Sequence, residues 1–283
     1  MRFDCVCLDF DGTLTLAEEG GARYVEEYRE DLSRRLERDL TGEWQRAEAS
    51  VREDPTLHGL LYQGKVVAPG NADPFIRSST VARMVMDEFG SFPESAERER
   101  VLGELYAAAY DHTTTVFRGD ARPVLERLSE TGLPVFVVTN SRTDSVERKI
   151  AGLLGAAARP PAVFGDAKKA ILEEPEPPDA RFDALPATRA LPGLPRPVYL
   201  RRGRYYEALR AIWQRARTEP ARTLLVGDIY ELDLAMPLEL GVSVHLLEGQ
   251  VTSAHERHFV ADHPRGSVSS SLGAVLERLG VPA

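Results

Sequence analysis

The chain has 283 residues, of which 43% are hydrophobic and 28% charged, and its formal net charge is −9. This length suits one large α/β domain, or a core domain with a smaller companion. The diffuse negative charge argues against a general nucleic-acid or anionic-membrane binder, so we expect neither partner.

The sequence has no apolar run long enough to span a bilayer, and no basic N-terminal region followed by an apolar stretch. We therefore expect a cytoplasmic protein. The sequence does not indicate an oligomeric state.

The first predicted strand, residues 3–8, brings two aspartates onto a glycine turn. Asp9 and Asp11 follow the strand directly, and Gly12 turns the backbone at once. Both carboxylates are therefore expected at the rim of a sheet, where such crowding favours a bound cation. Cys5 and Cys7 lie two residues apart in this strand, too badly placed to form a disulfide, and we expect both to be buried.

The next hundred residues, 17–116, break the pattern of strands and are charge-dense and mostly helical. An insertion of this length directly after the first strand predicts a second, helical domain. Within it, Ser78 and Ser79 are expected to cap a helix that runs through Val81, Met84 and Val85.

After residue 116, apolar runs with strand character alternate with amphipathic stretches of helical length. The predicted strands are residues 134–139, 162–164, 223–226 and 242–247, and the predicted helices include residues 121–131 and 204–217. Continuous apolar strands suit a parallel sheet that is covered on both faces. The alternation therefore predicts an α/β fold with a doubly wound parallel sheet. A proline-rich segment, residues 173–197, is expected to form an extended loop rather than a regular helix. It could drape over the rim of the sheet, but we favour a loose loop on the surface.

Polar residues follow three of these strands: Asp9 and Asp11, then Thr139-Asn140-Ser141, then Asp228 and Asp233. In an open parallel sheet, ligands bind beyond the carboxyl ends of the strands. At about 4 Å and an effective dielectric constant of about 20, each pair of like charges costs about 4 kcal/mol, so four carboxylates at one rim require a cation. Because all the candidate ligands are oxygens, the sequence favours Mg²⁺ over Zn²⁺.

These residues resemble the signature motifs of the haloacid dehalogenase superfamily, which is dominated by magnesium-dependent phosphatases. The resemblance rests on residues 9–15 (Asp-Phe-Asp-Gly-Thr-Leu-Thr), Thr139-Asn140, and residues 227–233 from Gly227 to Asp233. It implies a Rossmann-like catalytic core formed by residues 1–16 and 117–283. Residues 17–116 stand in the place of that family's helical C1 cap.

The resemblance also implies a role for each matching residue. Asp9 would be the nucleophile that forms an aspartyl-phosphate, and Asp11 the general acid and base. Mg²⁺ would be held by the Asp9 carboxylate, the Asp11 backbone carbonyl and Asp228, with Asp233 close by or acting through water. Thr139 and the backbone N–H of Asn140 would hold the phosphoryl oxygens of a small phosphorylated substrate.

One part of the family pattern is missing, because no Lys-Pro pair precedes the last acidic motif. Three residues are candidates for the cation that binds phosphate. Arg202 fits by its place in the chain, immediately before a predicted helix, whereas Lys168 and Lys169 fit by residue type. An arginine would still neutralise phosphate, although its shape differs.

Other activities of the same superfamily are weighed against a phosphatase. Its dehalogenases lack the second aspartate, so Asp11 favours phosphate chemistry. A phosphomutase would use the same aspartyl-phosphate. A phosphonate-cleaving enzyme would need a lysine in the cap that forms a Schiff base, and Lys65, the one lysine there, lies in a polar loop that does not suit this role. A non-catalytic module that binds metal and phosphate is the alternative outside enzymes.

Overall fold

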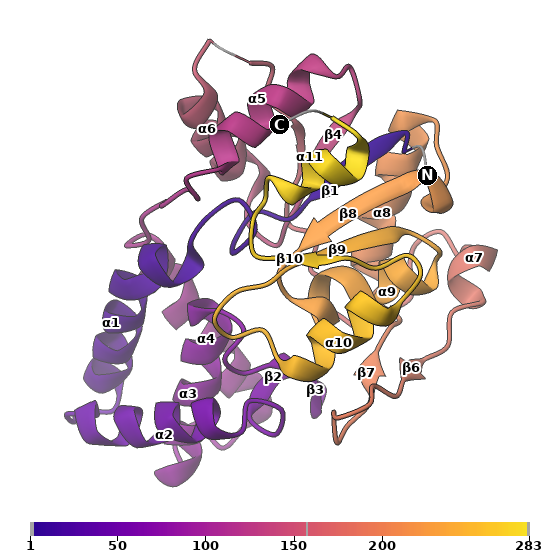
Figure 1. Cartoon of the computed structure of the whole chain (residues 1–283). Coiled ribbons are helices and arrows are strands. Elements are labelled where there is room, and N and C mark those ends of the chain that lie inside the picture. Colours follow the sequence, from indigo (N-terminus) through magenta and orange to yellow (C-terminus); the bar gives the residue numbers. More distant parts are fainter. Residues whose placement is uncertain (1–2, 157, 282–283) are drawn as a thin grey trace. The chain divides into compact units, whose positions relative to one another are not determined.

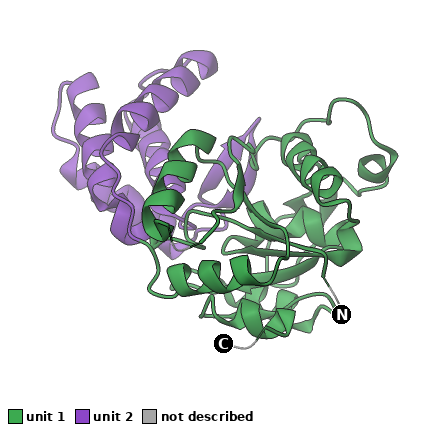
Figure 2. Ribbon diagram, turned by 90° about the horizontal axis from the view of Figure 1, so that it is seen from above, with its two compact units in different colours: residues 1–16, 117–283 green, residues 17–116 purple. Residues whose placement is uncertain are grey.

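The structure is a computed structural model, and it describes residues 3–156 and 158–281. The chain divides into two compact units, residues 1–16 with 117–283 and residues 17–116 (Figure 2). Thr15 forms an antiparallel bridge with Phe117, so the chain leaves and re-enters the first unit at one place. In the part of the chain that the structure describes, no helix combines the length and the apolar character that a membrane crossing requires.

The first unit is built on a six-stranded sheet in the order β10-β9-β8-β1-β4-β5, with every pair parallel (Figure 1). The strands are β1 (Cys5–Leu8), β4 (Val135–Val138), β5 (Ala162–Phe164), β8 (Thr223–Gly227), β9 (Ser243–Leu247) and β10 (Val268–Ser269). Strands that follow β1 in the chain lie on both sides of it, so the order reverses at β1. The predicted doubly wound parallel sheet is confirmed, with β10 as an edge strand that the sequence did not predict.

Helices cover both faces of this sheet because successive residues of each strand point to opposite sides. Val6 and Leu8 pack on the side of α5 (Ala121–Glu130), α6 (Thr143–Leu154) and α11 (Ala274–Leu279). Cys5 and Cys7 face α8 (Gly203–Ala216), α9 (Ala235–Glu239) and α10 (Ala254–Asp262). Both cysteines are buried and form no disulfide, as expected.

The proline-rich segment differs from the surface loop that the sequence predicted. It contains a one-turn helix, α7 (Ala180–Asp183), and a strand, β6 (Thr188–Arg189), that pairs antiparallel with β7 (Val198–Tyr199). The helix is possible because its turn contains no proline and the Asp179 carboxylate accepts a hydrogen bond from the Arg181 N–H at 2.9 Å. Apolar side chains at residues 182, 185, 191 and 194 are buried in the same core as α8, so the segment is packed against the core. The remaining short helices of this unit are η1 (Pro220–Arg222) and η2 (Tyr230–Leu234), a single π-helical turn.

The second unit consists of four helices and one hairpin. The helices are α1 (Ala17–Arg35), α2 (Thr41–Glu53), α3 (Pro74–Glu88) and α4 (Ser95–Tyr110), and the hairpin joins β2 (Gly59–Tyr62) to β3 (Lys65–Pro69). The four helices pack around a core of their own that contains Tyr28, Trp44, Val85 and Leu105.

The predicted cap of α3 is wrong. Asp73, not Ser78 or Ser79, caps this helix, because its carboxylate accepts the Ile76 N–H at 2.6 Å and Pro74 occupies the first helical position. Both serines lie inside the helix and donate to the carbonyl oxygens of Pro74 and Ile76, at 2.8 and 3.0 Å.

Candidate active site

Three neighbouring strands bring the predicted site residues to one edge of the sheet. β1 pairs with β4 on one side and β8 on the other, and the register places Leu8 opposite both Val137 and Val226. The residues that follow these strands therefore lie at the same edge, where the strand order reverses.

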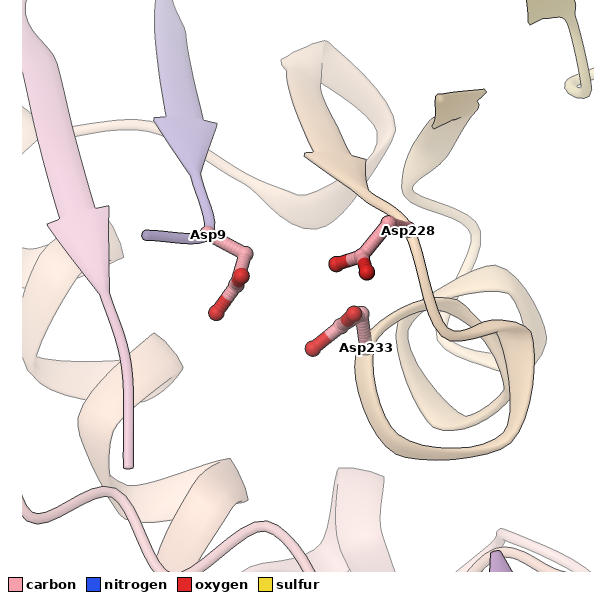
Figure 3. Close-up of side chains that lie close together, drawn as sticks. All are labelled: Asp9, Asp228 and Asp233. Carbon is pink, nitrogen blue, oxygen red and sulfur yellow. The ribbon is translucent and has the colours of Figure 1, made fainter. Parts of the chain in front are cut away.

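Three carboxylates meet at this edge. Asp9, Asp228 and Asp233 each offer an oxygen, and these three oxygens lie within 4.8 Å of one another. The three side chains point toward a common space from β1, from the end of β8 and from η2 (Figure 3). Asp9 and Asp233 are buried, and Asp228 is partly exposed.

Lys169 brings a positive charge into this group. Its ammonium Nζ donates to Asp9 Oδ1 at 2.6 Å and to Asp233 Oδ1 at 2.7 Å, and the side chain is buried. Burial alone would lower the pKa of Lys169, but Asp233 and Asp9 outweigh it and raise that pKa above the usual value. The ammonium therefore stays charged and is fixed between two carboxylates.

The turn after β5 explains why Lys169, and not Lys168, reaches the site. Asp166 and Lys168 have φ angles of 52° and 47°. The Asn140 side chain accepts the Lys169 N–H at 2.8 Å, which holds the turn against the end of β4. Lys168, by contrast, is exposed to solvent.

The alternative that placed Arg202 in the phosphate-binding role is not supported by the geometry. Its side chain is fully buried, and its guanidinium donates to the carbonyl oxygens of Lys169 and Tyr199, at 2.6 and 3.1 Å. Burial lowers the pKa of Arg202 to about 10, although nearby carboxylates oppose this shift. Arg202 thus supports the backbone of the lysine that enters the site.

The two aspartates after β1 have different surroundings. The Asp11 carboxylate lies outside the group of three and accepts a hydrogen bond from the Ser141 hydroxyl at 2.6 Å. Burial raises the pKa of Asp11, and the Ser141 hydrogen bond opposes the rise. Burial also raises the pKa of Asp9, to about 7, with Lys169 opposing and Asp233 adding to the shift.

Thr139 lies beside this pair at the end of β4. It is buried, and its hydroxyl oxygen accepts the Ser141 N–H at 3.1 Å. The predicted residues Asp9, Asp11, Thr139, Asn140 and Lys169 thus share one edge of the sheet.

The acidic loop, residues 227–233, is held in place by several hydrogen bonds. Asp233 Oδ2 accepts the Ile229 N–H at 3.0 Å, and the Asp233 carbonyl accepts the Tyr205 hydroxyl at 2.8 Å. Thr13 donates to Asp228 Oδ1 at 3.2 Å. A Cβ at Gly12, which has a φ of +88°, would lie 2.1 Å from Asp228 Oδ2, so only glycine fits there.

The donor set at this edge fits a divalent magnesium ion. All three side chains offer carboxylate oxygens, which are the ligands that Mg²⁺ prefers. Three carboxylates face one ammonium, which leaves two negative charges to be balanced. A site of this composition and charge matches a hard dication better than a zinc ion.

Ser141, Thr13 and Tyr205 complete the site, and the sequence did not assign them a role. Ser141 and Thr13 lie next to Asn140 and Gly12, within the polar segments that the sequence analysis singled out. Their position in the chain could therefore have indicated that they belong to the site. Tyr205 comes from α8, and its hydroxyl reaches Asp233 only because the helix packs on the sheet. No sequence pattern pairs these two residues.

Comparisons with known proteins point to one family. A family model described as haloacid dehalogenase-like hydrolase matches residues 3–241. No curated protein gives a significant match.

Several solved structures share the fold. A protein from Bacteroides fragilis described as haloacid dehalogenase-like has a TM-score of 0.56 and 15% identity, covering 97% of this chain and 100% of its own. A protein from Bacillus subtilis described as a HAD-hydrolase (haloacid dehalogenase-type), solved with magnesium, has a TM-score of 0.55 and 11% identity. The match covers 99% of this chain and 100% of that protein's chain. A protein from Haemophilus somnus described as a predicted phosphoglycolate phosphatase has a TM-score of 0.56 and 14% identity, covering 98% of each chain. At these identities the likeness concerns the fold.

Proposed function

The chain belongs to the haloacid dehalogenase-like hydrolases, and from this premise we propose that it is a magnesium-dependent phosphatase acting on a small phosphorylated metabolite. The observation that carries the proposal is that the two aspartates after β1 have different partners. Asp9 lies with Lys169 among the carboxylates, whereas Asp11 is held apart by Ser141. This difference supports Asp9 as the nucleophile and Asp11 as the residue that transfers a proton.

Asp9 is the proposed nucleophile. One of its carboxylate oxygens forms a bond to phosphorus while the bond from phosphorus to the leaving oxygen breaks, which gives an aspartyl-phosphate. The Lys169 ammonium, 2.6 Å from Asp9 Oδ1, orients this carboxylate and offers positive charge to the phosphoryl oxygens. The Thr139 hydroxyl and the Asn140 backbone N–H hold the other phosphoryl oxygens.

Asp11 is the proposed general acid and base. It gives a proton to the leaving alcohol in the first step and takes one from water in the second, so that it returns to its starting state. The raised pKa of Asp11 suits a carboxyl group that must hold a proton before it donates one. The Ser141 hydroxyl, at 2.6 Å, fixes the direction of the carboxyl group.

Asp9, Asp228 and Asp233, with the Asp11 backbone carbonyl, are the residues proposed to hold Mg²⁺. When bound, the ion would neutralise the charge of the phosphoryl group and of the crowded carboxylates. The Bacillus subtilis hydrolase that shares the fold was solved with magnesium, which supports this choice of ion.

Two features support the proposed substrate class. The dehalogenases of the superfamily lack an aspartate at the position of Asp11, so its presence favours a phosphoester over a carbon–halogen bond. The inserted unit, residues 17–116, stands in the chain where the family carries a cap, which favours a small substrate.

The experiment that tests this function is a turnover assay with a panel of phosphorylated metabolites, with Mg²⁺ and with a chelator. We expect phosphate release that requires Mg²⁺. Asp9→Asn should abolish it, and Asp11→Asn should lower it by about 10²–10⁴-fold. Asp262→Asn, an exposed aspartate on α10, is the matched control and should keep full activity.

Full activity in either active-site variant would contradict the assignment. A phospho-enzyme that passes its phosphoryl group to a sugar phosphate but not to water would instead indicate a phosphomutase. Neither turnover nor a phospho-enzyme would indicate a non-catalytic module.

A further inference from the structure

An ion pair, largely buried, joins the acidic loop to the proline-rich segment, outside the group of three carboxylates. Glu231 stands between Asp228 and Asp233 in the chain, and its side chain is fully buried. Both of its carboxylate oxygens accept hydrogen bonds from the Arg196 guanidinium, each at 2.7 Å. This bidentate geometry fixes both the position and the orientation of the two side chains.

Arg196 comes from the proline-rich segment, and this segment is itself anchored. The backbone N–H of Gly203 donates to the Glu173 carbonyl at 2.7 Å, which ties the start of the segment to the start of α8. Within the segment, Leu191 and Leu194 are buried in the core, and Arg189 forms an ion pair with Glu239 at the end of α9. These contacts therefore hold in place the part of the chain from which Arg196 reaches Glu231.

The turn that Arg196 contacts is the one that sets the position of Asp233. η2 is a single π-helical turn, Tyr230–Leu234, and the Asp233 N–H donates to the Ile229 carbonyl at 2.8 Å. The Tyr205 hydroxyl holds the Asp233 carbonyl from α8. Arg196 holds the middle of the same turn through Glu231, on the side of the proline-rich segment.

We propose that Arg196 is a positioning residue for the metal site: through its bidentate pair with Glu231 it holds the acidic loop so that the Asp228 and Asp233 carboxylates stay converged. The inference rests on the proposed function, because it concerns the same magnesium site. It gives the proline-rich segment a role in metal binding, although the segment supplies no ligand.

Stability alone is a weak explanation for this pair. Replacing both partners of a buried ion pair by apolar residues of similar size is often neutral or stabilising, because the desolvation of two charges is avoided. A pair that serves only the fold can therefore be replaced without loss. A pair that positions metal ligands cannot, since two flexible apolar side chains do not reproduce the fixed geometry.

The test compares metal affinity with stability in a double variant, Arg196→Met with Glu231→Met. Mg²⁺ alone is titrated into the protein by calorimetry, and the melting temperature is measured without metal. We expect a melting temperature near that of the wild type and a Kd for Mg²⁺ raised about tenfold or more, as for other residues that orient metal ligands. Arg196→Lys keeps the charge but loses the bidentate geometry, and it should raise the Kd by a smaller factor.

The matched control removes another arginine–glutamate pair whose arginine comes from the proline-rich segment, Arg181→Met with Glu219→Met. This pair has the same 2.7 Å separation but is exposed, and its loss should leave the Kd unchanged. An unchanged Kd in the Arg196 and Glu231 double variant would overturn the inference while leaving the proposed function intact. If that variant does not fold, an unchanged Kd in Arg196→Lys overturns the inference and a raised one supports it. A wild-type chain that binds no Mg²⁺ would overturn the proposed function, and the inference with it.

Discussion

Lys168 and Lys169 are neighbours of the same type that have opposite surroundings. Lys169 is buried between Asp9 and Asp233, and Lys168 is exposed to solvent. The difference arises from two residues with positive φ angles in the turn after β5. The side chain that enters the site is thus decided by backbone geometry, which is why the sequence left Lys168, Lys169 and Arg202 as alternatives.

Substituting the same residue at both lysines separates their roles. Lys169→Met should lower turnover by about 10²–10³-fold, because a fixed positive charge beside the proposed phosphoryl site is lost. Lys168→Met is the matched control and should keep the wild-type rate. The measurement is kcat and KM for the best substrate at saturating Mg²⁺, and an equal loss in both variants would contradict the assignment.

The buried His245, on β9, is expected to make the stability of the fold depend on pH. Its ring nitrogens lie 2.7 and 2.8 Å from the hydroxyl groups of Ser267 and Ser269. Burial lowers its pKa to about 4 from an ordinary value of 6.5. As the pH decreases below about 6.5, His245 binds a proton in the unfolded chain, whereas in the folded protein it does so only near pH 4. The free energy of unfolding therefore falls as the pH decreases from about 6.5 to about 4.

We expect the contribution of His245 to lower the free energy of unfolding by about 2 kcal/mol between pH 7 and pH 5. His245→Gln should remove that part of the slope, as measured by urea unfolding at each pH. His258→Gln, at an exposed position on α10, should keep the wild-type slope. The same slope in the wild type and in His245→Gln would show that His245 is not responsible.

At the scale of elements, the buried strands were predictable and the short turns were not. β1, β4, β5, β8 and β9 are mainly apolar along their length, although Thr223 begins β8 and Ser243 and His245 lie in β9. Burial on both faces of a parallel sheet produces this pattern. The β2–β3 hairpin was missed because its turn depends on Gln63 and Gly64 at φ angles of 48° and 74°. Gly64 was the available signal, but glutamine rarely marks such a turn.

The start of α3 gives a prediction at this scale. Asp73→Ala should lower the free energy of unfolding by about 1 kcal/mol, because the Ile76 N–H loses its capping partner. Ser79→Ala, inside the helix, should have a much smaller effect, since alanine is the better helix former. Chemical denaturation of both variants measures the difference, and a larger cost for Ser79→Ala would restore the original assignment of the cap.

For the whole molecule, the strand ends predicted more of the site than the intervening segments did. Asp9, Asp228 and Asp233 come together because parallel strands place their carboxyl ends at one edge. Tyr205 and Arg196 come from segments whose contacts depend on three-dimensional packing. Nothing in the local sequence around either residue indicates which residue it contacts. The acidic residues of the candidate site could therefore be predicted from the sequence, whereas the residues that support them could be found only in the structure.

The central claim is that Asp9 carries the phosphoryl group during turnover. It is tested by mixing the protein with Mg²⁺ and p-nitrophenyl phosphate, quenching in acid and reducing with borohydride, which converts an aspartyl-phosphate to homoserine. Asp11→Asn is included because it should slow the second step and let the intermediate accumulate. Peptide mass spectrometry should find homoserine at position 9 and at no other aspartate. Turnover of the phosphoester with an unmodified Asp9, or with modification at a different residue, would contradict the account.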